Sequence, residues 1–294
     1  MPLLDVSRDI RDTRYVPRSG RLPVEAFTLS SLRRRVDLAA VGAERLHFHL
    51  VLVGLDGSGE HEVDFGLVPV EPLRLVHVRP GQVHRWLQPH AYEAQLVLLP
   101  DDAPLQPPAT PDRPPSRLLT PDEWLRCAAL PPLLDDELRH EQPPEARDRA
   151  LHALRDLLVV RLGIDRPGPA DSSRADAGSS PLPPPYVALR AELEAHPTPL
   201  RSVAELAAAL GYAPRTLTRA CLAATGRTAK QVVDERGYLE ARRLLVHTDR
   251  PVRAVAAQLG FTEPTNFTKF FVRMSGSTPG RWRSGYAAGG GVRG

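Results

Sequence analysis

Residues 251–271 read PVRAVAAQLGFTEPTNFTKFF, and nearly the same pattern occurs about fifty residues earlier. In the earlier copy, SVAELAAALGYAPRTLTRACLAATGRT, Ser202 and Glu205 form an S-x-x-E capping box that predicts a helix start. Gly211 ends that helix, because a left-handed residue is least costly as glycine. Pro214 suits the first turn of the next helix, since it has no amide hydrogen to leave unpaired. A helix, a short turn with glycine and a second helix make a helix-turn-helix.

The second copy follows the first in register. Val252, Val255, Ala256 and Leu259 match the apolar face of the first copy at an offset of 49, and Gly260 matches Gly211. Beyond the turn the offset becomes 50, so the second turn holds one extra residue. Two copies in register on a basic segment favour DNA binding over the alternative, a helical repeat with a purely structural role.

A helix is also predicted between the two copies. Thr228 and Gln231 form its capping box, and the 20 residues from Thr228 to His247 would extend about 30 Å. One turn of B-DNA is about 34 Å, so such a spacer can hold two recognition helices in successive major grooves. Gly237 weakens this helix by about 1 kcal/mol relative to Ala, and the sequence gives no reason for it.

Charge and composition agree with a soluble protein that meets a polyanion. The 294 residues are 42% hydrophobic and 25% charged. Residues 186–294 hold 16 Arg and Lys against 8 Asp and Glu, a net charge of +8. The chain totals of 38 and 35 leave 22 and 27 for residues 1–185, a net of −5. We therefore expect the C-terminal third to bind a polyanion. Cys127 and Cys221 are too far apart for a metal or redox motif, which indicates two reduced structural thiols.

The motifs of the last third resemble the DNA-binding domain of the AraC/XylS family of bacterial transcription regulators. The resemblance covers roughly residues 186–285 and is strongest in RPVRAVAAQLGFTEPTNFTKFFVRMSGSTPGRWR, with its A-x-x-x-G-F, F-x-x-x-F and G-x-T-P elements. It implies a double helix-turn-helix that binds promoter DNA. The chain departs from the family pattern at Cys221, Gly237, Tyr238, Asn266 and Val272.

The DNA contacts are predicted from helical faces. With Leu217, Ala220 and Cys221 facing inward, the first copy presents Arg215, Thr216, Thr218 and Arg219. With its phenylalanines inward, the second copy presents Glu263, Thr265, Asn266, Thr268 and Lys269. Arginine can bind guanine with two hydrogen bonds, Asn can read adenine and Glu cytosine, while Lys269 is better suited to phosphate. The alternative for each charged residue is a solvated face.

Residues 21–100 alternate apolar and polar positions between frequent Gly and Pro, which predicts short antiparallel strands in a barrel or sandwich. The stretch HFHLVLVGLDGSGEHEVDFG and the later VRPGQVHRW are similar to a cupin-type barrel. Val53 and Gly54 stand where a metal-binding cupin has its Glu, so we predict no metal and no cofactor. His47, His49, His84 and Trp86 are instead candidates for an effector pocket, with ordinary barrel residues as the alternative.

The sequence thus predicts an α+β multidomain protein, with a cupin-like antiparallel β-barrel followed by helices and an all-α C-terminal domain. In residues 117–163 the stripe Ala150, Leu151, Leu154, Leu157, Leu158 and Leu162 either packs on the barrel or joins two protomers. The predicted divisions are an N-terminal arm (1–20), the barrel (21–100), a Pro-rich connector (101–116), the helical segment (117–163), a flexible linker (164–185), the DNA-binding domain (186–285) and a disordered tail (286–294).

The leading hypothesis is therefore a transcription regulator without enzymatic activity that responds to a small-molecule effector and binds double-stranded promoter DNA. A homodimer is possible, and RNA polymerase is a further partner if the protein is an activator. Charges occupy the N-terminus where a signal peptide is apolar, so we expect a cytoplasmic protein with no membrane partner. The alternatives are a cupin metalloenzyme (oxygenase or isomerase) with a helical appendage and a DNA-repair methyl acceptor, which would need a cysteine cluster.

Overall fold

The computed structural model describes residues 10–15, 23–101, 103, 116–141, 143–164 and 182–289. The chain divides into two compact units, an N-terminal unit of residues 11–108 and 112–168 and a C-terminal unit centred on residues 169–294. The predicted arm, Pro-rich connector, linker and tail lie largely outside the described residues, so their boundaries stay predictions.

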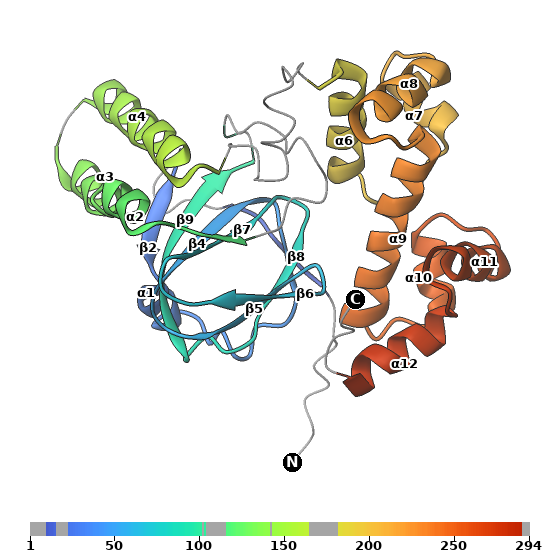
Figure 1. Cartoon of the computed structure of the whole chain (residues 1–294), viewed down its shortest axis with the longest axis horizontal. Helices are drawn as coiled ribbons and strands as arrows, with labels where there is room; N and C mark the ends of the chain where they lie inside the picture. Colours follow the sequence, from blue (N-terminus) through green and yellow to red (C-terminus); the bar gives the residue numbers. More distant parts are fainter. Residues whose placement is uncertain are drawn as a thin grey trace. The chain divides into compact units, whose positions relative to one another are not determined.

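Two five-stranded sheets form the core of the N-terminal unit (Figure 1). Their strand orders are β1–β3–β8–β5–β6 and β10–β7–β4–β9–β2. Among the described strands every pair is antiparallel except β1 with β3, which is parallel and which the sequence did not predict. The strands are β1 (Arg11–Thr13), β2 (Glu25–Thr28), β3 (Glu44–Leu46), β4 (Phe48–Gly57), β5 (Gly59–Val63), β6 (Gly66–Val70), β7 (Arg74–Val78), β8 (Val83–Trp86), β9 (Tyr92–Pro100) and β10 (Ser116–Leu118).

Alternation along β4 shows why the second sheet is buried on both faces. Leu50 and Leu52 pack into a core shared with the first sheet, while Val51 and Val53 point to the opposite face. Both sets are buried, so β4 reads as an apolar run. The α+β fold class is confirmed, and the predicted barrel takes the form of two sheets with a common core.

Three helices cover the outer face of the second sheet: α2 (Pro121–Ala128), α3 (Leu130–Arg139) and α4 (Pro144–Leu162) (Figure 1). A short helix, α1 (Leu29–Arg33), follows β2. The apolar stripe of α4 packs on its own sheet, since Leu151, Leu158 and Leu162 are buried against it. Leu157 and Val160 remain outside that core, 39% and 52% exposed.

The C-terminal unit is helical, as predicted. Its helices are α6 (Pro184–Ala195), α7 (Val203–Ala209), α8 (Pro214–Thr225), α9 (Ala229–His247), α10 (Val252–Gln258), α11 (Pro264–Ser275) and α12 (Pro279–Gly289). One apolar core joins α6, α7 and α8 to the first half of α9, and a second joins its other half to α10 and α11. None of the described helices is long and apolar enough to span a membrane.

The long helix α9 runs through both cores and links the two helix-turn-helix copies (Figure 1). Its 19 residues extend about 28 Å. Gly237 lies in its middle, and a Cβ atom built there would lie 2.6 Å from Cδ1 of Leu200, in the connection between α6 and α7. Glycine at this position therefore allows Leu200 to approach the helix backbone, which is the reason that the sequence alone did not supply.

Candidate nucleic-acid interface

Helix α8 has one buried and one exposed face. Leu217, Ala220 and Cys221 are buried in the first core, as predicted. The helix begins with Pro214 and ends at Gly226, whose φ of 73° is left-handed. The predicted contact residues lie away from the core: Arg215 and Arg219 are exposed, and Thr216 and Thr218 are half-buried.

Helix α11 repeats this arrangement in the second copy. Phe267, Phe270 and Phe271 are buried, and Gly276 ends the helix with a φ of 73°. The predicted contacts Glu263, Thr265, Asn266 and Lys269 are exposed, and Thr268 is half-buried. The Thr268 hydroxyl donates to the carbonyl oxygen of Pro264 at 3.1 Å, so it keeps only acceptor capacity for an outside partner.

Each of these outward faces also carries one exposed apolar residue, which the sequence analysis did not predict as a DNA contact. Leu222 on α8 and Val272 on α11 are 47% and 37% exposed, and they stand fifty residues apart at equivalent positions. At 100° per residue, each lies close to the centre of the face opposite the buried residues. The helical period of the sequence already places both residues on these faces.

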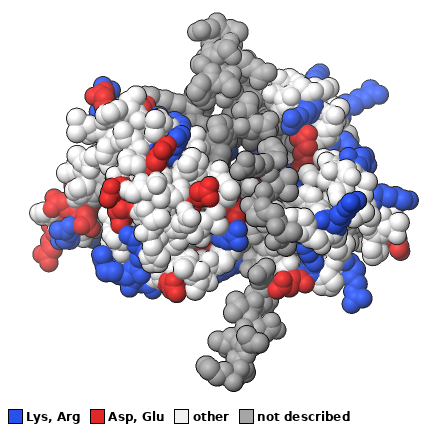
Figure 2. Space-filling model, turned by 60° about the horizontal axis from the view of Figure 1, so that its bottom comes forward, with Lys and Arg blue, Asp and Glu red and all other residues white. Residues whose placement is uncertain are grey.

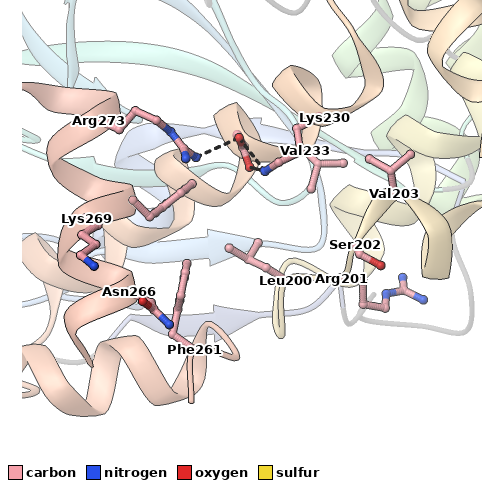
Figure 3. A pocket seen from close by; sticks show the side chains of 12 residues that line it. Leu200, Arg201, Ser202, Val203, Lys230, Val233, Phe261, Asn266, Lys269 and Arg273 are labelled. Carbon is pink, nitrogen blue, oxygen red and sulfur yellow. Dashed lines mark hydrogen bonds and ion pairs between the residues drawn. The ribbon is translucent and has the colours of Figure 1, made fainter. Parts of the chain in front are cut away.

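A groove of about 590 Å³ lies inside the C-terminal unit, between the start of α7, the first turns of α9 and one side of α11 (Figure 3). Four cationic residues line it: Arg201, Lys230, Lys269 and Arg273. The last two lie on the recognition helix of the second copy, and Lys230 and Lys269 are the only lysines of the chain. Such a concentration of positive charge suits a phosphate backbone.

One carboxylate organises this groove. Asp234 of α9 accepts from Lys230 at 2.7 and 2.9 Å and from Arg273 of α11 at 3.1 Å (Figure 3). Arg273 also stacks over the ring of Phe270, with 5.5 Å to its centroid. Asp234 thereby ties the recognition helix of the second copy to the beginning of the connecting helix.

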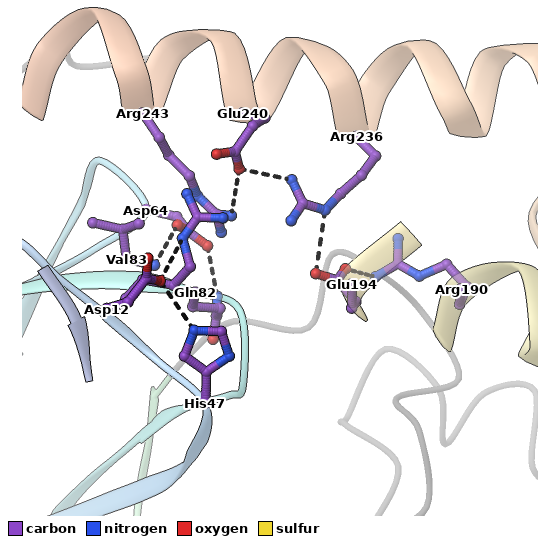
Figure 4. A network of polar contacts seen from close by, with 11 residues as sticks. Asp12, His47, Asp64, Gln82, Val83, Arg190, Glu194, Arg236, Glu240 and Arg243 are labelled. Atoms are coloured by element: carbon purple, nitrogen blue, oxygen red, sulfur yellow. Dashed lines mark hydrogen bonds and ion pairs between the residues drawn. The ribbon is translucent and has the colours of Figure 1, made fainter. Parts of the chain in front are cut away.

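Some of the C-terminal arginines have structural partners instead. Arg236 of α9 donates to Glu194 of α6 and to Glu240, both at 3.2 Å, and Arg243 donates to Glu240 at 3.3 Å (Figure 4). Arg190 pairs with the same Glu194. Arg236 and Glu240 are buried, so this network braces α9 against α6. On the face drawn in Figure 2, the charged residues of the C-terminal unit, at the right, are still mostly Lys and Arg.

Comparison with known proteins agrees with this geometry. A family model described as a helix-turn-helix domain matches residues 206–285. The DNA-binding domain of AdpA, a global transcriptional factor whose crystal structure contains a target DNA, is 32% identical, and the match covers 94% of that domain and 35% of this chain with a TM-score of 0.33. The chain belongs to the AraC/XylS family of transcription regulators.

Two further solved structures are similar to this AraC/XylS protein. An AraC-type regulator from Chromobacterium violaceum is 21% identical, with 95% of its chain and 36% of this one covered and a TM-score of 0.32. ToxT from Vibrio cholerae is 7% identical, with 98% of its chain and 89% of this one covered and a TM-score of 0.38. No curated protein sequence matches the chain.

In this AraC/XylS protein the predicted effector pocket is only partly assembled. Of its four residues, all of which the structure describes, only His84 and Trp86 are in ring contact, with centroids 5.7 Å apart. The half-exposed His47 lies 3.0 Å from Asp12 through its Nε2 atom (Figure 4). His49 lies 3.0 Å from His77, on the sheet face covered by helices. His47 and His49 therefore do not join the other two.

His61 takes their place beside His84 and Trp86. The pairing of β5 with β8 sets His61 opposite Trp86, with ring centroids 4.7 Å apart, and His61 Nε2 lies 3.1 Å from His84 Nδ1. Burial lowers the pKa of His84 from 6.5 to about 3 and that of His61 well below 6.5, so both rings are neutral at pH 7. Their outer nitrogens, His61 Nδ1 and His84 Nε2, are buried without a hydrogen-bond partner.

The sequence did not single out His61, which lies 23 residues before His84 in the chain. Only the register of β5 against β8 brings it to the other two residues. Within the part of the chain that the structure describes, no cluster of three or more His, Cys, Asp or Glu side chains is arranged to hold a metal ion. The prediction of no metal and no cofactor stays a prediction.

Proposed function

We propose that this transcription regulator binds double-stranded promoter DNA with α8 and α11 in successive major grooves. The observation that carries the proposal is the pair of equivalent helices, each with a buried apolar face and an exposed polar one. A connecting helix of about 28 Å is close to the roughly 34 Å of one DNA turn. The relative that was crystallised with target DNA has the same kind of domain.

In this arrangement Arg215 and Arg219 read base edges, and the cations of the groove between α7, α9 and α11 hold phosphates. Arginine binds guanine O6 and N7 with two hydrogen bonds, whereas a lysine ammonium is better suited to a phosphate. Asp234 holds Lys230 and Arg273 in place until the DNA backbone competes for them.

The test is a selection of binding sequences from random duplexes by the full chain, followed by anisotropy titration of Arg215→Ala on the selected site. We expect a loss of about 1–3 kcal/mol in binding free energy and relaxed preference at one base pair. Arg139→Ala is the matched control, because it removes an exposed arginine of α3 in the other unit. Unchanged affinity of Arg215→Ala would remove this residue from the interface.

We further propose that the N-terminal unit responds to a small-molecule effector through His61, His84 and Trp86. Two buried nitrogens without a hydrogen-bond partner, beside an indole ring, offer hydrogen bonds and apolar contact to a neutral polar ligand, and the carboxylate of Glu44 lies 3.9 Å from one of them, His84 Nε2. Genomic footprinting of the tagged protein in its host identifies the neighbouring genes and hence candidate compounds. Those compounds are then titrated while the intrinsic tryptophan fluorescence is followed, with His84→Phe as the variant that should lose the response.

Two partners complete the proposal. A second copy of the chain would use the exposed apolar side chains of the helical layer, Leu125 at 74%, Leu133 at 47%, Leu157 at 39% and Val160 at 52%. RNA polymerase would be the partner if the protein is an activator, and a cytoplasmic location follows from promoter binding. Sedimentation velocity of the full chain tests the dimer.

A further inference from the structure

The two recognition helices share a feature beyond their polar contacts, an exposed aliphatic side chain at equivalent positions. Leu222 and Val272 are 47% and 37% exposed, and neither belongs to the apolar cores of the C-terminal unit. Single exposed apolar residues are ordinary on protein surfaces. Here, however, each copy places one on the face that is expected to meet DNA, one turn beyond Thr218 and Thr268, respectively.

The surroundings of Leu222 show what it can touch. It lies in a shallow depression of about 360 Å³ with Pro214, Arg215, Thr218 and Arg219. Leu222 thus lines the same depression as two arginines that are suited to guanine edges, one helical turn beyond Arg219. A duplex bound by these arginines would have neighbouring base pairs close to the leucine.

The major groove offers a specific apolar partner for such a side chain. Among the groups that base pairs display there, the C5 methyl of thymine is the apolar one, and the others are hydrogen-bond donors or acceptors. An aliphatic side chain cannot pair with those donors and acceptors, so the methyl group is the one with which it makes a favourable apolar contact. The chemistry of the position therefore selects thymine.

We propose that Leu222 and Val272 each contact the 5-methyl group of a thymine, so that the two segments of the binding site carry T·A pairs about one helical turn apart. This inference rests on the proposed binding of α8 and α11 in successive major grooves. It makes Leu222 and Val272 specificity residues, whereas the groove cations supply affinity for any sequence.

The test uses deoxyuridine, which differs from thymidine only by the absent methyl group. Each thymine of the site selected by the full chain is replaced singly by deoxyuridine, and dissociation constants are measured at one salt concentration. We expect one thymine in each segment whose replacement weakens binding about three- to fivefold, the effect of losing one buried methyl contact. All other replacements should change affinity much less.

Two protein variants assign the contacts. In Leu222→Ala, deoxyuridine at the first thymine should no longer reduce the affinity, while deoxyuridine at the second thymine should still reduce it. Val272→Ala should give the reciprocal result. Both positions are exposed, so the variants should keep the helical circular dichroism of the wild type. Leu67→Ala, which truncates a leucine of β6 that is 48% exposed, is the matched control and should retain both deoxyuridine effects.

The outcomes separate the two levels of the proposal. If a site is selected but no deoxyuridine effect depends on Leu222 or Val272, the thymine contacts are wrong and the DNA-binding function stands. The thymine contacts are also wrong if Leu222→Ala weakens binding to all sites equally, because that would indicate a contact with the sugar–phosphate backbone. They are likewise wrong if Leu222→Ala impairs transcription but not DNA binding, because that would indicate a contact with a protein partner. If no sequence is enriched, the proposed function and the thymine contacts fail together.

Discussion

The two helix-turn-helix copies share one backbone plan but are stabilised by different interactions. In both, the recognition helix begins with a proline and ends at a left-handed glycine. The first copy opens with the capping box of Ser202 and Glu205, whereas α10 follows Pro251 and has no side-chain cap. Proline and glycine therefore set the ends of the recognition helix in both copies, whereas a side-chain cap stabilises the first helix of the first copy alone.

The cores differ most. In the first copy Cys221 is buried where the second has Phe271. Phe271 is in ring contact with Tyr238 at 5.2 Å and with Phe267 and Trp282 at 5.9 Å between centroids. Aromatic side chains bury large areas, so the core of the second copy depends on three phenylalanines, whereas that of the first is mostly aliphatic.

The largest expected effect on stability comes from truncating the residue that differs most between the two cores. Phe271→Ala should lower the free energy of unfolding by about 3–5 kcal/mol, because it leaves a cavity among aromatic rings. Cys221→Ala should cost only about 1 kcal/mol, since it removes a single buried atom. Urea unfolding of the full chain followed by circular dichroism compares the two. Similar losses for both variants would show that the cores are equivalent.

The turns offer the next comparison. Gly211 and Gly260 have φ values of 71° and 88°, and a side chain in this region costs about 1–2 kcal/mol. A Cβ on Gly260 would also lie 2.9 Å from Cβ of Pro199, whereas one on Gly211 would meet nothing within 4 Å. Gly260→Ala should therefore be more destabilising than Gly211→Ala, by about 1 kcal/mol or more, in thermal unfolding. A larger loss for Gly211→Ala would contradict this account.

The exposed faces of α8 and α11 allow a comparison of DNA binding by the two copies. Arg219→Ala should cost about 1–3 kcal/mol of binding free energy on the selected site and relax preference at one base pair. Lys269→Ala should weaken all sequences nearly equally and reduce the slope of log affinity against log salt by about 1. Anisotropy titrations at several salt concentrations measure both, with Arg139→Ala as the control. A base-specific effect of Lys269→Ala would reverse the assigned roles.

The smallest effect concerns the caps. Ser202→Ala should destabilise the first copy by about 1 kcal/mol, because the amide of Glu205 loses its acceptor. Ser202→Thr should keep most of the stability, since threonine also caps a helix. Urea midpoints of the three proteins provide the measurement, and a Ser202→Thr variant as weak as Ser202→Ala would remove the cap explanation.

The sequence predicted the C-terminal unit well because its signals are local. The capping boxes at Ser202 and Thr228, the prolines at helix starts and the glycines at helix ends act within a few residues. Helical periodicity then separated the buried phenylalanines from the exposed contact residues. The same periodicity places Leu222 and Val272 on the exposed faces, although only polar residues were predicted as DNA contacts. Whether any of these residues touches DNA stays a prediction.

Tertiary structure decided what depends on pairing between distant segments. Strand register brought His61 to His84 and Trp86 and left His47 and His49 with other partners. The packing of Leu200 against α9 explains why residue 237 is glycine. The fold also decides which charged residues of α9 pair with Glu240 in the buried network and which pair with Asp234 in the groove. The sequence alone determined the helix ends and faces, since these follow from neighbours along the chain. The effector candidates required the fold, because strand register is a relation between residues far apart in the chain.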